Sequence, residues 1–533
     1  MKKYLLSIFA LISPILTFAQ EATEMGIDEK IDQAFGSATG WFVDAIFYKI
    51  PFSENVQVYW VLFPLILGAT YFTFYFNLIN FRGFITSVNI VRGKYDDLEG
   101  REDHKVEMSK LPFTDEEDNP DTIRVEGHDG EVSHFQALTA ALSATVGLGN
   151  IAGVAIAVSI GGAGATFWMI VAGFLGMASK FVECTLGVKY RDIEDDGTVY
   201  GGPMYYLTKG LKSKGFTKLG KVLAALFAVF VIGGSFGGGN MFQVNQAAQL
   251  FEYMTGGEES FIFGYRWVFG LVMAILVAIV IIGGIKSIAK VADKIVPFMV
   301  VIYVAAALFV IFANYDMIGD AFVQIFNGAF SPEGVAGGAV GVLVQGFRRA
   351  AFSNEAGVGS ASIAHSAVKT RYAASEGMVA LLEPFIDTVV VCTMTALVLI
   401  ITGNVTSANA GLNDAQAILL TSGAFESVIS WFPYVLTIAV VLFAFSTMIS
   451  WSYYGFQGWA YLFGRTKKME YTYKLLFCIF VVIGAAASLG SVIGFSDAMI
   501  FAMMVPNMIG LVLLAPKVKR ELNRYMKAIK ESK

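Results

Sequence analysis

Charged residues are scarce in this chain of 533 residues, in which 15% are Asp, Glu, Lys or Arg and 56% are hydrophobic. A mean hydropathy of +0.61 lies outside the range of a soluble globular domain. The basic residues are scattered through short loops and a C-terminal tail without interleaved aromatics, which argues against nucleic-acid binding. We therefore predict an integral membrane protein with the lipid bilayer as partner and no nucleic acid.

Cysteine and histidine are also rare. Cys184, Cys392 and Cys478 fall within apolar runs and lack the spacing of a metal site, and the four histidines are scattered. We expect buried cysteines, no protein-bound transition metal and no cofactor. The sequence also shows no nucleophile with a matching base, so we do not expect an enzyme.

The N-terminus has the pattern of a secretory signal. Met1-Lys2-Lys3 precede an apolar run at residues 4–18, and small residues stand at Thr17 and Ala19. We predict a signal peptide over residues 1–19, followed by an extracytoplasmic segment at 20–55. The alternative is an uncleaved anchor, but the run is shorter than the roughly 20 residues that cross a bilayer.

Eleven apolar runs are long enough to cross a bilayer. Because the hydrocarbon core offers no water to backbone groups, each run is expected to be a helix. The predicted spans are 56–78, 136–160, 164–188, 221–247, 262–284, 294–314, 336–366, 376–402, 431–457, 472–494 and 497–516. Residues 317–330 are read as an interfacial helix before the seventh span. The sequence thus predicts an all-α, polytopic transmembrane domain over residues 56–516.

The distribution of Lys and Arg predicts the orientation of these spans. The predicted outer stretches 250–261, 315–335 and 403–430 contain no Lys or Arg, whereas the opposite loops and the tail at 517–533 are rich in both. We therefore expect a multi-pass protein of the inner (plasma) membrane, with the mature N-terminus outside and the C-terminus cytoplasmic. The acidic insert at 95–131 is predicted to be a flexible cytoplasmic loop.

Two spans are interrupted by glycines and polar residues. The second contains TVGLGNIAG (145–153), and the seventh contains FSNEAGVGSAS (352–362). Since the interrupted spans lie five apart, spans 2–6 and 7–11 are predicted to form inverted repeats, each opening with a broken helix. Spans arranged in this way bring the two breaks together near the middle of the bilayer.

A broken helix exposes backbone groups that bind ions. Its free N–H groups attract a carboxylate and its free carbonyls attract a cation. Gly147 and Gly149 allow a close approach, and Thr145 and Asn150 add polar contacts. The competing interpretation, close helix packing through small residues, does not account for Asn and Glu beside the glycines.

Six motifs resemble the alanine or glycine:cation symporter family from about residue 56 to 515. They are TVGLGNIAGVAIAV, KFVECTLGVKYRD, GGPMYYL, GFRRAAFSNEAGVGSASIAHSA, LEPFIDTVVVCTMTAL and FAFSTMISWSYYG. VGLGN also resembles the first broken helix of neurotransmitter:sodium symporters, whose LeuT-type fold has five plus five inverted helices. The resemblance implies that fold with one additional N-terminal span, and sodium-coupled uptake of a small amino acid. The long acidic insert and the signal-like N-terminus depart from the family pattern.

The resemblance also implies a substrate site at the two breaks. Backbone amides near Gly147 are expected to meet the substrate carboxylate, and the seventh span the ammonium group. Phe352 and Trp451 are expected to supply the bulk that excludes large side chains. The predicted substrate-binding residues are Thr145, Gly147, Gly149, Asn150, Gln243, Phe352, Asn354 and Trp451.

A sodium site is implied by the hydroxyl pair Ser446 and Thr447 on the ninth span. By the same resemblance, the carbonyls of Ser143 and Val146 complete it. Hydroxyls in membrane helices often bond back to their own helix, which is the alternative for this pair. Na⁺ is therefore expected as a co-transported ion.

Five charged residues are predicted inside the membrane: Arg348, Arg349, Glu355, Glu383 and Asp387. Such charges need a cavity or a partner. We expect Glu355 to form an ion pair with one of the arginines, with proton coupling at Glu355 as the alternative. Glu383 and Asp387, four residues apart on one helix face, are expected to make scaffold hydrogen bonds.

Together these observations predict a secondary transporter that brings a small neutral amino acid, alanine or glycine, into the cell with Na⁺. The alternatives are a proton-coupled symporter of the same fold and, with less support, a cation channel, since no repeated pore-lining motif appears. No protein partner is inferred.

Overall fold

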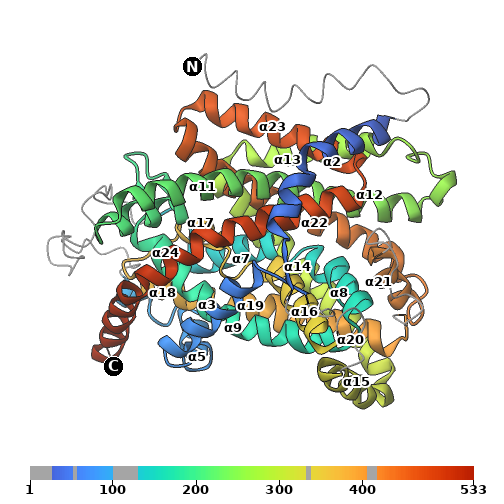
Figure 1. Cartoon of the computed structure of the whole chain (residues 1–533), viewed down its shortest axis with the longest axis horizontal. Helices are drawn as coiled ribbons and strands as arrows, with labels where there is room; N and C mark the ends of the chain where they lie inside the picture. The colour runs from blue at the N-terminus through green and yellow to red at the C-terminus, as the bar shows by residue number, and fades with distance from the viewer. Residues whose placement is uncertain (1–26, 52–56, 100–129, 332–337, 405–416, 533) are drawn as a thin grey trace.

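The computed structural model describes residues 27–51, 57–99, 130–331, 338–404 and 417–532 (Figure 1). The predicted signal peptide and residues 100–129 of the acidic insert lie outside these ranges. The described chain is largely helical, and it contains two short antiparallel hairpins. In these hairpins Ile50 faces Val58 and Ile193 faces Val199.

The elements of the N-terminal part run in chain order as α2 (Ile27–Ile46), β1 (Lys49–Pro51), β2 (Gln57–Tyr59), α3 (Leu62–Tyr75), α4 (Ile79–Arg82), α5 (Phe84–Val91), α6 (Asp96–Glu99), α7 (His134–Thr145), η4 (Gly149–Gly153), α8 (Val154–Gly161), α9 (Gly164–Lys189), β3 (Asp192–Ile193), β4 (Val199–Tyr200), α10 (Pro203–Tyr205), η5 (Tyr206–Gly210), α11 (Thr217–Phe236), η6 (Gly237–Met241), α12 (Phe242–Met254), η7 (Gly257–Glu259), α13 (Arg266–Ile281) and α14 (Gly284–Ala313).

The second part continues with η8 (Tyr315–Met317), α15 (Ile318–Phe330), α16 (Gly338–Asn354), α17 (Ala361–His365), α18 (Ala373–Ala380), α19 (Leu382–Pro384), η9 (Phe385–Cys392), α20 (Thr393–Ile401), α21 (Ala417–Glu426), α22 (Phe432–Phe463), α23 (Lys467–Ala486) and α24 (Leu489–Glu531).

Seven helices of the described residues are long and apolar enough to cross a membrane, and the bent pair formed by α7 and Leu148–Gly161 raises this to eight. The seven are α9, α11 continued into α12, α14, α18 continued to α20, α22, α23 and α24. Shorter apolar helices are α3, α13 and α21. The protein is therefore an integral membrane protein, and the predicted fold class is confirmed at this level.

Each predicted span overlaps a helix or a broken helix. Residues 318–330 form the helix α15, and its place at the membrane interface stays a prediction. The predicted outer stretch 403–430 contains the helix α21, which was not among the predicted spans. Its apolar run ILL is too short to stand out beside the longer spans. The basic tail is helical, because α24 continues from the membrane segment to Glu531.

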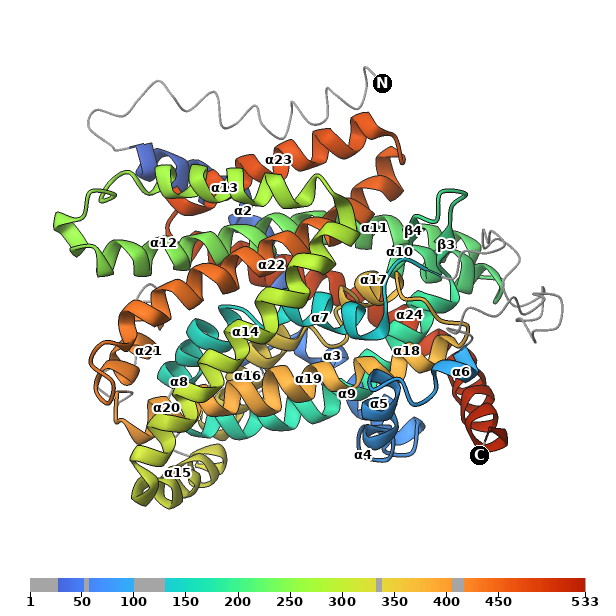
Figure 2. The ribbon, with the colours of Figure 1, turned by 180° about the vertical axis from the view of Figure 1, so that it is seen from behind.

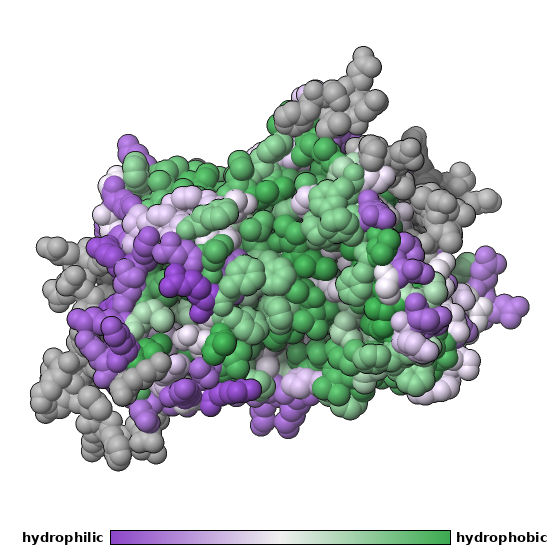
Figure 3. Space-filling model, turned by 90° about the horizontal axis from the view of Figure 1, so that it is seen from below, coloured by the Kyte–Doolittle hydropathy of each residue, from purple (hydrophilic) through white to green (hydrophobic). Residues whose placement is uncertain are grey.

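Lipid-facing surface is visible on the outside of the molecule. Hydrophobic residues cover the middle of the face in Figure 3, and hydrophilic residues gather toward its ends. Large exposed apolar side chains include Ile279 of α13 and Phe298 and Phe312 of α14. Such a continuous apolar surface is stable against hydrocarbon and unfavourable in water.

The first helix break follows from local sequence. A capping box of Ser133 and Gln136 starts α7, whose last residue is Thr145. Val146 then turns to an extended ψ of 91°, and the chain resumes in the π-helical turn η4 and α8. The two halves are bent by 56°. The glycines of this stretch thus mark a real interruption of the helix, as predicted.

The second break lies between α16 and α17 and uses left-handed backbone at three positions. Glu355, Gly357 and Gly359 have φ angles of 55°, 83° and 100°. Glycine adopts this conformation freely, whereas it costs a residue such as Glu355 about 1–2 kcal/mol. The two breaks lie in the middle of the molecule, where α7 packs against α22 and α8 packs against α16 (Figure 2).

Candidate functional site

A small enclosed cavity of about 10 Å³ lies between the two helix breaks, with room for about one water molecule. Its lining residues are Ala144, Thr145, Gly149, Gly238, Gln243, Phe352, Glu355, Trp451 and Ile500. Five of the predicted substrate-binding residues are among them: Thr145, Gly149, Gln243, Phe352 and Trp451. The site is therefore tightly closed in this conformation.

Trp451 forms one wall of the cavity and is almost fully buried, at 1% exposure. The indole lies against the backbone of η6, because a Cβ added to Gly239 would sit 2.2 Å from Trp451 Cγ. Phe352 forms another wall and meets Phe242 edge-on, with ring centroids 5.3 Å apart. The glycines of η6 therefore give the Trp451 wall its position.

Glu355 also lines the cavity, and its partners differ from those predicted. The indole N–H of Trp451 donates to Glu355 Oε1 at 3.1 Å, and the hydroxyl of Ser360 donates to Oε2. The expected ion pair between Glu355 and an arginine was wrong, because Arg348 and Arg349 both donate to Asp497 instead. The arginines belong to the regular helix α16, whereas Glu355 lies beyond its end in the left-handed turn.

The arginine pair connects α16 to α24 beside the cavity. Distances to Asp497 Oδ2 are 2.7 Å from Arg348 Nη2 and 3.1 Å from Arg349 Nη2. The guanidinium of Arg349 also lies 5.9 Å from the centre of the Phe352 ring. This ion-pair cluster, which sequence reasoning missed because Asp497 lies far along the chain, therefore borders the Phe352 wall.

Gln243 links the first break to η6. Its side-chain carbonyl accepts a hydrogen bond from the Leu148 N–H at 3.4 Å, and its amide donates to Gly238 O at 2.9 Å. The N–H of Gly147 donates to the side chain of Asn150 at 2.8 Å. Polar groups of the first break are thus held by hydrogen bonds in this closed arrangement.

Asn150 and Asn354 point away from the cavity, toward η9. Asn150 donates to Asp387 Oδ1 at 2.6 Å, and Asn354 donates to Thr388 Oγ1 at 2.9 Å. Ser353 also donates to Asp387, at 2.8 Å. The two asparagines hold the broken helices against η9, and Asp387 makes the scaffold hydrogen bonds expected of it. A direct contact of either asparagine with substrate stays a prediction.

The residues predicted to bind sodium meet where α7 ends against α22. The Thr447 hydroxyl donates to Ser143 O at 3.0 Å, and the Ser143 hydroxyl donates to Ser446 O at 2.8 Å. Ser446 bonds back to Phe443 O at 3.0 Å, as the alternative for hydroxyls predicted. The last predicted ligand, Val146, is the C-cap residue of α7.

Gly147 is the predicted substrate-binding residue that adjoins this pair. A Cβ at position 147 would lie 2.6 Å from Thr447 Oγ1 and 3.4 Å from Gln243 Oε1. Only a residue without a side chain fits here without displacing Thr447. Gly147 therefore lies between the cavity and the hydroxyl of α22.

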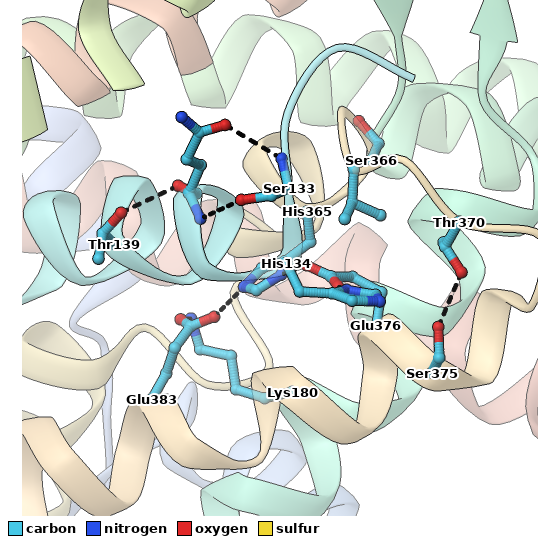
Figure 4. Close-up of polar contacts among 12 residues, drawn as sticks. Ser133, His134, Thr139, Lys180, His365, Ser366, Thr370, Ser375, Glu376 and Glu383 are labelled. Carbon is cyan, nitrogen blue, oxygen red and sulfur yellow. Dashed lines mark hydrogen bonds and ion pairs between the residues drawn. The ribbon is translucent and has the colours of Figure 1, made fainter. Parts of the chain in front are cut away.

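A buried chain of acidic and basic side chains extends from α9 to the start of α7, and Figure 4 shows how its members lie. Lys180 contacts Glu383 at 2.9 Å, and Glu383 also contacts Nε2 of His365. Nδ1 of His365 lies 2.5 Å from Glu376 Oε1, and Glu376 Oε2 contacts Nδ1 of His134. We call these five residues the Glu–His chain.

Two of the histidines that are scattered in the sequence lie close together in the structure. The fold brings His134 and His365, which lie far apart in the chain, onto opposite oxygens of Glu376. The available signal was the spacing of Glu376 and Glu383, seven residues apart and hence on one face of a helix. Glu383 does make the scaffold contacts expected of it.

Two residues of the Glu–His chain, together with the neighbouring Cys184, resemble a metal site in composition. Ligand atoms of Cys184, His365 and Glu383 lie within 4.8 Å of one another, and all three residues are buried. However, the Lys180 ammonium already forms an ion pair with the Glu383 carboxylate, and both ring nitrogens of His365 face carboxylates. A divalent cation is unfavourable beside that ammonium, so the cluster fits protons better than a metal.

A larger cavity of about 520 Å³ lies by the hairpin β3–β4 and the end of α22. Arg465 donates to Asp192 Oδ2 at 3.0 Å and lies 4.1 Å from the centre of the Tyr200 ring. Lys209 also contacts Asp192. Burial raises the pKa of Tyr200 to about 12, so its phenol stays neutral beside these cations. This ion-pair cluster fastens the hairpin to the chain that leads into α23.

The chain is similar in sequence and in fold to known proteins. The profile of the sodium:alanine symporter family matches residues 116–533. The chain is 43% identical over 417 residues to the sodium/alanine symporter AgcS of Methanococcus maripaludis, covering 78% of this chain and 87% of that protein. It is 32% identical over 472 residues to the amino-acid carrier protein AlsT of Bacillus subtilis, covering 88% and 90%.

Among solved structures, MhsT in complex with L-phenylalanine has a TM-score of 0.53 at 16% sequence identity. The match covers 73% of this chain and 90% of that chain. At this identity the likeness concerns the fold alone.

Proposed function

The chain belongs to the sodium:alanine symporter family, and from that premise we propose that it imports alanine or glycine together with Na⁺. Members of this family are transporters, so the protein is a secondary transporter in the membrane and not an enzyme.

The observation that carries the sodium assignment is the contact between Thr447 Oγ1 and Ser143 O at 3.0 Å. It brings a hydroxyl oxygen of α22 and a carbonyl oxygen of the broken helix to one point. Oxygen ligands of this kind suit a hard cation. Na⁺ at this point would hold α7 against α22, and its release would let the two helices separate.

The amino acid would occupy the closed cavity between the breaks. Backbone N–H groups of the first break would bind its carboxylate, as the unwound end of a helix does for anions. The Glu355 carboxylate and the Gln243 carbonyl, which face the same cavity, supply acceptors for the ammonium group. Phe352 and Trp451 would limit the side chain to hydrogen or methyl, which favours glycine and alanine over larger amino acids.

We further propose that residues 56–516 form eleven spans, of which spans 2–6 and 7–11 are inverted repeats. The N-terminus would lie outside and the C-terminus inside. Helices at all eleven predicted ranges, and the pairing of two broken helices at one cavity, support this topology. The fold likeness to MhsT supports a LeuT-type core. In this arrangement the inner (plasma) membrane supplies the sodium gradient.

One Na⁺ crossing a potential of about 100 mV contributes roughly 2.3 kcal/mol. That amount corresponds to accumulation by tens of fold, because about 1.4 kcal/mol changes an equilibrium tenfold. A single co-transported ion is therefore sufficient to concentrate alanine inside a cell.

The proposal is tested by equilibrium binding of labelled alanine to the purified protein in detergent. Alanine should bind in NaCl and bind at least tenfold more weakly in choline chloride at the same ionic strength. Glycine should compete with it, and phenylalanine should not. Binding of equal strength in both salts would contradict the assignment of Na⁺ as the coupling ion. Absence of alanine binding in both salts would contradict the assignment of alanine as the substrate.

A further inference from the structure

The Glu–His chain contains one imidazole held between two carboxylates. Nδ1 of His365 lies 2.5 Å from Glu376 Oε1, and Nε2 contacts Glu383 Oε1. Glu376 then reaches His134, the first residue of α7. All of these side chains are at most 1% exposed, so no water competes for the contacts.

These contacts fix the number of protons in the bridge. A short contact between a ring nitrogen and a carboxylate oxygen is attractive only when a proton lies between them. A neutral imidazole carries one N–H, so it would direct a lone pair at one of the two carboxylates. The bridge Glu376–His365–Glu383 therefore holds two protons in this conformation.

Charge balance gives the same count. Lys180 is fully buried and its ammonium compensates Glu383, at 2.9 Å. An imidazolium at His365 compensates Glu376, which makes the four residues neutral together. Without that proton the group would carry one uncompensated buried negative charge, which is strongly unfavourable away from water. His134 needs only one proton, which a neutral imidazole at the positive end of α7 supplies.

Other ionisable groups face this bridge from every element packed around it. They are Glu183 and Cys184 of α9, Arg191 near the carbonyl of Ser366, Glu355 at the second break, and Tyr454 of α22. Among them Arg191 is a cation, but its guanidinium is used by the carbonyls of Ser366, Val368 and Thr370. The groups in contact with Glu376 are therefore the imidazoles of His134 and His365, and His365 is the one whose two ring nitrogens both face carboxylates.

We propose that the Glu376–His365–Glu383 bridge is a proton-binding site of the transport cycle, filled when the cavity closes and emptied when α7 moves away. The proposal rests on the proposed function, because it assumes that α7 moves during transport. The ligand is a proton, and the site is separate from the sodium ligands on α7 and α22.

The Glu–His chain provides a route for the proton. His365 gives the proton on Nδ1 to Glu376 Oε1, which breaks an N–H bond and forms an O–H bond. For the next transfer, the neutral imidazole of His134 must carry its single proton on Nε2, and the Glu376 O–H must rotate toward Nδ1. The O–H bond then breaks as an N–H bond forms on Nδ1. The imidazole releases its Nε2 proton to solvent, which leaves it neutral with one proton on Nδ1. His134 follows the partly exposed Ser133, so the route ends near the surface at the start of α7.

The bridge is also connected to the amino-acid cavity. The charge of Lys180 acts on Glu383 and on Glu355, and Glu355 lines the cavity. An ammonium group arriving beside Glu355 draws that carboxylate into a new ion pair and changes the field at Lys180. Substrate binding and proton binding therefore influence each other through one lysine.

The test measures proton uptake when alanine binds. Purified protein in weakly buffered detergent solution, with a soluble pH dye, receives NaCl and then alanine at pH values from 6 to 9. We expect uptake of about one proton per bound alanine over part of this range, with the linked fall in alanine affinity as pH rises. His365→Gln should abolish the uptake while the alanine still binds.

Two further variants keep the test decisive. Tyr206→Phe removes a buried hydroxyl that donates to Asn507, outside the bridge, and should leave proton uptake unchanged. If His365→Gln does not fold, His134→Gln should slow proton uptake in stopped-flow measurements without changing its amplitude. Alanine binding without proton uptake in the wild type, or equal uptake in His365→Gln, would overturn the proposal. Absence of sodium-dependent alanine binding would instead count against the proposed function.

Discussion

The indole N–H of Trp451 donates a hydrogen bond to the carboxylate of Glu355 at 3.1 Å, and both side chains line the central cavity. The bond joins α22 to the break between α16 and α17, two segments almost a hundred residues apart. Glu355 holds its left-handed backbone conformation while making it. A strained residue in a cavity wall is a common sign of function, because the surrounding contacts must sustain the strain.

Trp451→Ala should enlarge the cavity and admit larger amino acids. Removing the indole leaves space beside Phe352, so valine and leucine should compete with labelled alanine in the variant and not in the wild type. Trp459→Ala is the matched control, since Trp459 lies on the same helix and is also buried but does not line the cavity. A competition profile equal to that of the wild type would show that Trp451 does not limit the size of the bound amino acid.

Glu355→Gln should separate the two roles of this side chain. The amide oxygen of glutamine still accepts from Trp451, so selectivity against large amino acids should persist. Loss of the negative charge should weaken alanine binding, by about 1.5–3 kcal/mol if the carboxylate accepts from the ammonium group. Glu355→Ala should lose both properties. Unchanged alanine affinity in Glu355→Gln would show that Glu355 only positions Trp451.

Gly147→Ala should impair sodium binding. The added Cβ would lie 2.6 Å from Thr447 Oγ1, so the hydroxyl must move away from Ser143 O. The sodium concentration for half-maximal alanine binding should rise at least tenfold. Gly153→Ala is the control on the same helix break, because a Cβ there meets nothing within 4 Å. Equal sodium dependence in the two variants would contradict the placement of the site.

The double variant Thr447→Val and Ser446→Ala tests the hydroxyl pair directly. Valine keeps the shape of threonine without its oxygen, so packing against α7 is preserved while the cation loses a ligand. Sodium-dependent alanine binding should be lost. Thr437→Val on the same helix, whose hydroxyl bonds to Pro433 O at 2.8 Å, should bind normally. Retained sodium dependence in the double variant would exclude this pair as ligands.

The two breaks were predictable because glycine and polar residues interrupt apolar runs, and this pattern reports backbone geometry directly. The convergence of Thr447 with Ser143 was predictable only from the family resemblance, since the two lie on different helices. Long apolar runs are also a local feature of the sequence, and all eleven predicted ranges overlap helices. The apolar run of α21 is shorter, and it was not predicted as a span.

Pairing between charges was not predictable. Arg349 and Glu355 are six residues apart, and the sequence suggested a pair, but the end of α16 separates them and Asp497 of α24 takes the arginine. His134, His365 and Glu376 meet only after α7, α17 and α18 have packed. Contacts of this kind depend on tertiary packing, which a single sequence does not encode in any local pattern.

The most direct test of the account is uptake of labelled alanine into proteoliposomes with the membrane potential clamped at zero. An inward sodium gradient at equal pH should drive accumulation of alanine above the outside concentration, and Thr447→Val with Ser446→Ala should abolish it. An inward proton gradient without sodium should drive none. Accumulation driven by the proton gradient alone, with no response to sodium, would contradict sodium-coupled symport.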